Sequence, residues 1–194
     1  MRSFFEIELG DHGDGWFLDF PVDSKTGESI DHGPIVLNGI VPTDLPSQIN
    51  VPIHQNGSWM NFSVDAFSLF FAGGSVLEVF KRMCSSHVSF IDCLVDGKEQ
   101  GIKMLVLHSL LDCLDFERSQ IDYYTEEDCE DEDDRRQKLG KIHYVRKLRI
   151  DPRRVPDEVH IFRLKQSLTR VIVSGNLRDL LLEAGIQGAE FAKC

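Results

Sequence analysis

Residues 88–113 read VSFIDCLVDGKEQGIKMLVLHSLLDC, two apolar and partly β-branched runs on either side of Asp96-Gly97. An Asp-Gly pair suits the positive backbone angles of a tight hairpin turn. We therefore expect an antiparallel pair of strands over 88–95 and 102–113. The second run is apolar from Met104 to Leu107, so its strand should be central and covered on both faces.

A helix is expected directly before this hairpin. Ser75-Val76-Leu77-Glu78 matches the capping box, in which a Ser and a Glu satisfy two backbone amides at a helix start. Apolar side chains then recur at helical spacing over Val76, Phe80, Met83 and Cys84. The spacing predicts an amphipathic helix that ends near Ser86.

The C-terminal part predicts three strands, at 144–150, 159–164 and 169–173, followed by a second helix that Ser174 caps. Its apolar face comprises Leu177, Leu180, Leu181 and Ala184, with Gly185 as the stop signal. Arg178 lies off this stripe and should face solvent. A closing strand is expected at 189–192.

The N-terminal part is different in composition. Gly, Pro, Asp and Asn are dense from residue 10 to residue 57, and prolines at 34, 42, 46 and 52 exclude a long helix. We expect one α+β domain over 1–194, with mostly antiparallel sheets and two main helices packed on them. Residues 1–74 should form an irregular Gly/Pro-rich layer over a core at 75–194.

Bulk properties exclude several classes of function. The formal net charge of −11 disfavours nucleic-acid binding, which needs basic residues, and favours a basic partner, although the charge also serves solubility. No apolar run approaches the ~20 residues of a membrane span, and residues 1–8 show no apolar h-region or cleavage site, so we do not expect secretion. Five cysteines without a C-x-x-C spacing indicate buried thiols and a reducing cytoplasm.

Residues 126–134 hold eight acids in nine positions, and 135–154 then hold nine Arg or Lys against one acid. Repulsion within the acidic run predicts a mobile loop over about 126–140. That loop is either a solvated linker or a charged surface for a basic partner. The contact residues on the second interpretation are Glu130, Asp131, Glu132, Asp133 and Asp134, with aromatic anchors drawn from Tyr123, Tyr124, Trp16 and Trp59.

Signs of catalysis or metal binding are weak. Asp112, Asp115 and Glu117 could perform acid/base chemistry, but such acids also fix the chain where it leaves a strand. Asp11-His12-Gly13 and its repeat Asp31-His32-Gly33 could form a metal site, although Asp and Gly beside a His are typical of surface turns. The sequence predicts no metal, no cofactor and no catalytic residue.

Several short segments carry a resemblance in the same order along the chain. They are LDCLDFERS (111–119), YTEED (124–128), LRIDP (148–152), HIFRL (160–164), VIVS (171–174) and LEAGIQGAEF (182–191). This series resembles immunity protein family eleven of bacterial polymorphic toxin systems. The acidic segment after Thr125 is longer here than is usual for the family.

The resemblance implies an antidote that binds a cognate toxin without covalent chemistry and protects the producing cell. It brings no catalytic residue. The recurring residues Asp112, Asp115, Arg118, Asp151 and Arg163 should serve the fold or the partner. Two other functions stay open from the residues alone, namely a small enzyme that uses the carboxylates at 112, 115 and 117, and a general adaptor or scaffold.

Overall fold

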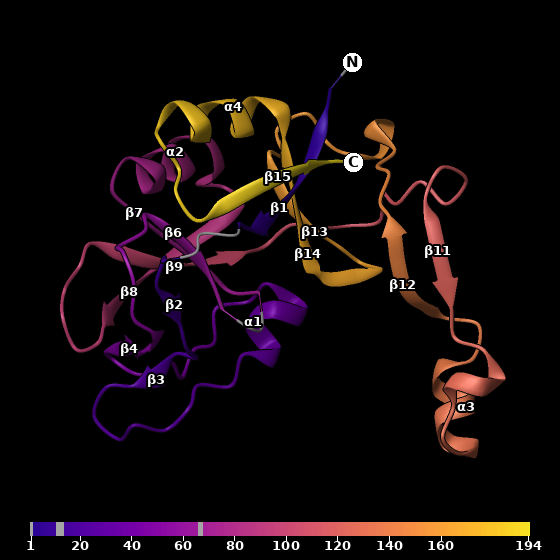
Figure 1. Ribbon diagram of the computed structural model, residues 1–194, viewed down its shortest axis with the longest axis horizontal. Coiled ribbons are helices and arrows are strands. Elements are labelled where there is room, and N and C mark those ends of the chain that lie inside the picture. The colour runs from indigo at the N-terminus through magenta and orange to yellow at the C-terminus, as the bar shows by residue number, and fades with distance from the viewer. Residues whose placement is uncertain (1, 11–13, 66–67) are drawn as a thin grey trace.

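The hairpin around Asp96-Gly97 lies at the centre of a six-stranded sheet in the computed structural model, which describes residues 2–10, 14–65 and 68–194 (Figure 1). Asp96 and Gly97 have φ of 53° and 74°, as the turn requires. The sheet runs in the order β3 (Val22–Asp23), β4 (Ile49–Val51), β8 (Val88–Val95), β9 (Ile102–Leu107), β7 (Phe70–Gly73) and β6 (Phe62–Val64). The central position expected for 104–107 is confirmed.

The second half of the hairpin does not continue to residue 113, contrary to the expectation of one strand. β9 ends at Leu107, and Leu110–Leu111 form β10, which pairs in parallel with β13 (Ile161–Leu164) in another sheet. Between them the Ser109 carbonyl accepts a hydrogen bond from the Arg163 amide at 2.9 Å. A single apolar run therefore crosses from one sheet to the other.

The second sheet has five strands, in the order β10, β13, β14 (Ser167–Ser174), β1 (Phe4–Leu9) and β15 (Ala189–Lys193). β1 is antiparallel to both of its neighbours. The interpretation of 1–74 as an irregular layer is wrong for β1 and for the N-terminal strands of the first sheet. The remaining elements of that segment are short: β2 (Phe17–Leu18), its partner β5 (Ile53–Gln55) and α1 (Gly33–Asn38).

The first of the two main helices, α2, spans Gly74–Cys84, close to the predicted range. Its expected capping box is wrong, because Gly73 occupies the cap position without a side-chain hydrogen bond. Ser75 instead donates its hydroxyl to the Ala184 carbonyl at 2.8 Å, and Glu78 pairs with Lys81 at 2.7 Å. The Ser hydroxyl thus joins two helices rather than starting one.

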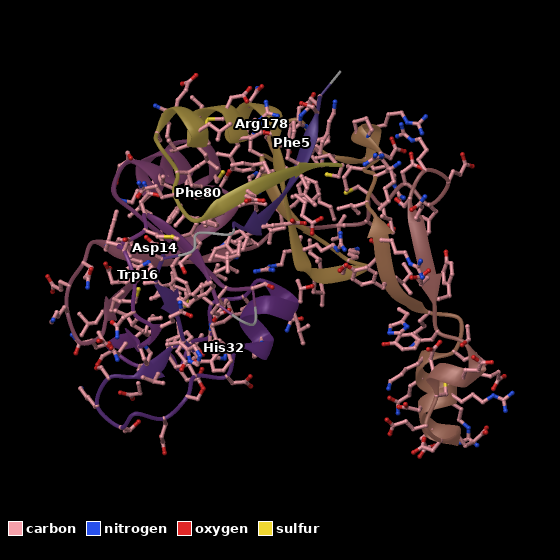
Figure 2. The ribbon with its side chains drawn as sticks, in the orientation of Figure 1. Phe5, Asp14, Trp16, His32, Phe80 and Arg178 are labelled. Carbon is pink, nitrogen blue, oxygen red and sulfur yellow. The ribbon has the colours of Figure 1, made fainter. Side chains whose placement is uncertain are left out.

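The second main helix, α4 (Gly175–Glu183), begins as predicted, with the Ser174 hydroxyl accepting from the Leu177 amide at 3.2 Å. Leu177 and Leu181 are fully buried. Arg178 does not simply face solvent, because its guanidinium carbon lies 3.8 Å from the centre of the Phe5 ring (Figure 2). The long Arg178 side chain covers a face of the Phe5 ring that would otherwise be exposed to water.

Three apolar clusters hold these layers together. One lies between α2, α4 and both sheets, and a second lies where the N-terminal segment covers the six-stranded sheet. The third packs Phe4, Phe162 and Ile172 of the five-stranded sheet against residues that follow β10 and β12. The α+β class with helices on mostly antiparallel sheets is confirmed. No helix among the residues described is long and apolar enough to cross a membrane.

One part of the chain extends away from these layers at the right of Figure 1. It consists of β11 (Gln120–Tyr123), the 3-10 turn η1 (Glu126–Asp128), α3 (Glu132–Lys138) and β12 (Ile142–Lys147). A second 3-10 turn, η2 (Pro152–Arg154), follows where the chain returns to the body. We call residues 120–147 the arm, and residues 112–119 with 148–154 the arm root.

Candidate functional site

The arm brings together most of the contact residues expected from the sequence. β11 and β12 form an antiparallel pair in which Asp122 lies opposite Tyr144, and α3 lies at the far end (Figure 1). Tyr123, Tyr124 and the acids at 130–134 all belong to this one element. Because they are close in sequence, a single hairpin suffices to group them.

The acidic run is helical over Glu132–Lys138, so the prediction of a loop is wrong there. The Asp131 carboxylate caps the helix by accepting from the Asp134 amide at 2.8 Å. Acids fill the first turn of α3 and bases fill its last turn, which is the arrangement that a helix dipole favours. The switch from acidic to basic residues therefore supplies the helix signal.

Most of the arm's basic residues neutralise acids of the same arm. Arg135 pairs with Glu126 at 2.8 Å, and Lys138 pairs with Asp134 at 2.7 Å, where its hydrogen bond lowers the pKa of the Asp134 carboxyl. The arm carries nine acids (122, 126–128, 130–134) and six Arg or Lys (135, 136, 138, 141, 146, 147). Its excess negative charge is thus far smaller than the acidic run suggests.

Aromatic side chains give the arm exposed apolar surface. Tyr123 is 47% exposed and Tyr144 is 56% exposed. Tyr124 stacks on His143 with ring centres 4.1 Å apart, and the Lys138 ammonium lies 5.9 Å from the Tyr124 ring centre. Exposed tyrosines beside charges are typical of protein-binding surfaces.

The two tryptophans named as anchors lie elsewhere. Trp16 is buried in the cluster under the N-terminal segment, so its assignment as an anchor is wrong, and Figure 2 places it on the side away from the arm. Trp59 is exposed, but its ring centre is 6.3 Å from that of Trp16. Neither residue belongs to the arm.

Arg170 of β14 fastens the arm to the body, a role for which no pattern in the sequence is a signal. Its guanidinium pairs with Glu6 of β1 at 2.8 Å, donates to the Val145 carbonyl of β12 at 2.6 Å, and lies 5.4 Å from the Tyr144 ring centre. Burial raises the pKa of the Glu6 carboxyl, while the charge of Arg170 opposes that rise. One cation thereby links the five-stranded sheet to the arm.

The family-motif acids lie at the arm root and are bound by arginines. Asp112 pairs with Arg154 at 3.1 Å and accepts from the Gln166 amide at 2.7 Å. Asp115 pairs with Arg118 at 2.5 Å, and the hydrogen bond from Arg118 lowers the pKa of the Asp115 carboxyl. These contacts fix the chain at the point where it leaves the body of the protein.

The other two motif residues also make internal contacts. Asp151 accepts from the Arg153 guanidinium at 2.9 and 3.0 Å, which lowers the pKa of Asp151 to about 2. Arg163 is buried and donates to the carbonyls of Leu168 and Ser68 at 2.7 and 2.5 Å. Of the carboxylates in the enzyme hypothesis, Asp112 is bound by Arg154 and Glu117 is exposed. The pKa of Asp115 is lowered, whereas a general acid needs a carboxyl whose pKa is raised, so Asp115 gives that hypothesis no support.

Of the proposed metal-binding repeat, residues 11–13 lie outside the described residues. His32 is buried with its ring edge-on to Phe20 at 5.4 Å, so its assignment to a surface turn is wrong. The described residues contain no cluster of metal-ligating side chains. Cys84, Cys93 and Cys113 are buried as expected, and burial raises the pKa of each thiol to about 12.

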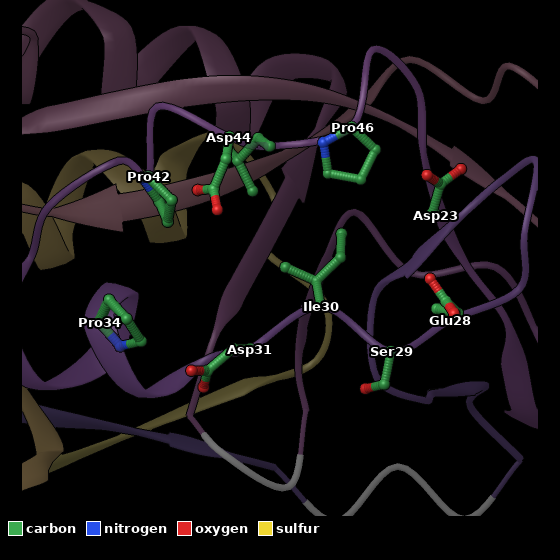
Figure 3. Close-up of a pocket in the computed structure, with 10 residues that line it drawn as sticks. Asp23, Glu28, Ser29, Ile30, Asp31, Pro34, Pro42, Asp44 and Pro46 are labelled. Carbon is green, nitrogen blue, oxygen red and sulfur yellow. The ribbon is translucent and has the colours of Figure 1, made fainter.

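Another acidic surface lies beside α1, at a pocket of about 420 Å³. Figure 3 shows the residues around Ile30 that line it. Its wall includes the acids Asp23, Glu28, Asp31 and Asp44, together with Pro34, Pro42 and Pro46. The Asp23 and Asp31 carboxylates accept from backbone amides of their own turns at 2.7 and 2.9 Å. These two acids therefore have local structural roles.

Comparison with known proteins supports the resemblance. Residues 46–194 match the model of the Immunity protein family (Imm11), a range that contains the arm, its root, both main helices and most of both sheets. Among curated protein sequences, none matches the chain. A match over this share of the residues shows the family, so the chain belongs to the immunity protein family Imm11.

Proposed function

We propose that this protein protects a bacterial cell by binding a cognate toxin of a polymorphic toxin system in the cytoplasm and covering its active surface. Family membership supports an immunity role. The acids at 112, 115 and 151 are bound by arginines within the arm root, which favours neutralisation by binding over neutralisation by chemistry.

The arm is the surface that we assign to the toxin. The observation that carries this assignment is its projection from the body with Tyr123 and Tyr144 exposed (Figure 1). Buried tyrosines supply much of the affinity at protein interfaces, whereas exposed charges act mainly on the rate of encounter. We therefore assign affinity to the tyrosines and attraction of a basic toxin to the acids at 130–134.

Co-expression with the toxin domain encoded beside this gene tests the function. Survival of the host cell and co-purification of the two proteins are the expected results. Cell death together with the absence of a complex would remove the immunity proposal for that pair.

Kinetic measurement with arm variants tests the surface. Tyr123→Ala should speed dissociation by tenfold or more, because an anchor loss of about 2 kcal/mol exceeds a factor of ten. Trp59→Ala, an exposed aromatic residue far from the arm, is the matched control and should change neither rate. Equal dissociation rates for wild type and Tyr123→Ala would contradict the assignment of this tyrosine as an anchor.

The acids are tested with Glu130→Gln/Asp133→Asn, which leaves the cap Asp131 and the paired Asp134 in place. This double variant should slow association a few-fold at low salt and leave dissociation nearly unchanged. Glu183→Gln/Glu190→Gln makes the same change of charge at exposed positions on α4 and β15. If both double variants slow association equally, the total charge and not the arm is responsible.

A further inference from the structure

A basic pocket lies where the arm root meets the edge of the five-stranded sheet. It has a volume of about 500 Å³, and its lining includes four Arg or Lys residues, Arg2, Arg118, Arg149 and Lys193. None of its lining residues is Asp or Glu. In a chain of formal net charge −11, this concentration of positive charge needs an explanation.

Arg2 is held in place by neutral groups. Its guanidinium donates to the carbonyls of Pro156 and Val159 at 2.7 and 2.6 Å. Its carboxylate partner, Asp157, is 3.5 Å away and has a fully exposed side chain, so water screens the pair. The backbone thus fixes the orientation of Arg2 and leaves most of its charge uncompensated.

Arg149 and Lys193 have still less compensation. Arg149 donates to the carbonyls of Leu148 and Lys193 at 2.8 and 3.2 Å. Within residues 2–10, 14–65 and 68–194, the ion pairs include neither Arg149 nor Lys193. Among the four cations, Arg118 alone has a close carboxylate partner, Asp115.

We propose that this pocket binds the phosphate group of a small molecule. Arg2 and Arg149 are half-buried, and a cation that is partly out of water is costly unless an anion lies beside it. Guanidinium groups bind the oxygens of phosphate in pairs, and the exposed Arg118 and Lys193 add positive charge to the same pocket. The volume exceeds that of a bare phosphate, and Phe4, Ile150 and Pro152 offer apolar contact to an attached group. A bound phosphate would join Arg2 and Lys193 of the body to Arg118 and Arg149 of the arm root.

This site is separate from the toxin-binding surface, so the outcome of its test does not depend on the immunity proposal. The test is an amide NMR titration of the full chain with sodium phosphate, at an ionic strength held constant with sodium chloride. Saturable shifts are expected at residues 2–4, 118, 149–150 and 193. Ribose 5-phosphate should bind at least as tightly, since the pocket has room for its sugar.

Two variants remove one cation each. Lys193→Gln should weaken phosphate binding about tenfold, the value of one charge-assisted hydrogen bond of about 1.4 kcal/mol. Arg149→Gln should weaken it at least as much, and a melting curve establishes that each variant is folded. Lys147→Gln, an exposed lysine on the arm, is the matched control and should bind as the wild type does.

Three results would overturn the proposal. The first is a set of shifts that chloride alone reproduces, which would indicate screening and no site. The second is an equal loss of affinity in Lys147→Gln and Lys193→Gln, which would indicate net charge. The third is tighter binding of acetate than of phosphate, which would assign the pocket to a carboxylate.

Discussion

Replacement of Arg170 by Met should destabilise the protein and loosen the arm. The side chains of Glu6 and Arg170 are 11% and 15% exposed, so removal of the cation leaves a carboxylate largely out of water. Breaking a buried pair typically costs 3 to 5 kcal/mol, and because Glu6 can take up a proton we expect about 3 kcal/mol. The change also removes the donor to the Val145 carbonyl in β12.

The loss should depend on pH in a defined direction. Burial already raises the pKa of Glu6 above its ordinary value, and loss of Arg170 raises it further. Between the ordinary value of about 4.5 and the raised value, folded Glu6 binds more protons than unfolded Glu6. Stability therefore falls as the pH rises through that range, and the cost of Arg170→Met should be smaller at pH 5 than at pH 7.5.

Urea unfolding at both pH values measures the cost, and hydrogen exchange of the β12 amides measures the loosening of the arm. The double variant Glu6→Gln/Arg170→Met should recover part of the stability, because no charge is left buried. A cost below 1 kcal/mol at pH 7.5, or a larger cost at pH 5, would refute this account of the pair. Unchanged exchange in β12 would refute its role in fastening the arm.

Three further changes test the packing and the arm helix. Leu181→Ala should lower the free energy of unfolding by about 2 to 5 kcal/mol in thermal or urea unfolding, because the side chain is fully buried. The exposed Leu182→Ala should lower it by under about 0.5 kcal/mol. Similar losses for the two variants would mean that the buried face of α4 is wrongly assigned. Arg178→Ala should cost about 1 kcal/mol in the same assay, since it uncovers the ring of Phe5, and a value near zero would refute the contact. Asp131→Ala should increase amide exchange across α3 without moving the global melting temperature; protection equal to the wild type would mean the cap is dispensable.

Local signals in the sequence predicted most local structure, although the capping box expected at residues 75–78 is wrong. The turn at Asp96-Gly97, the cap at Ser174 and the stripe of α4 each depend on residues within a few positions of one another. The position of β1 between β14 and β15 has no such signal, because it depends on partners more than 160 positions away. For the same reason the Glu6–Arg170 pair, separated by 164 positions, could not be inferred.

The acidic run shows how the choice of sequence window changes a prediction. Within 126–134 alone the charges repel one another, which favours a loop. With Arg135, Arg136 and Lys138 included, the acids at 132–134 become the first turn of a helix, with basic partners three and four positions away. Their grouping with Tyr123 and Tyr124 was predictable, because one hairpin contains them all.

The place of β1 has a consequence for the time at which the protein becomes active. Phe4–Leu9 leave the ribosome well before Ala189–Lys193, which form one of their two neighbouring strands. The five-stranded sheet cannot close until synthesis has passed residue 193, so a nascent chain carries an unpaired strand edge. A chain whose synthesis stops before residue 189 therefore leaves one edge of β1 open to other proteins.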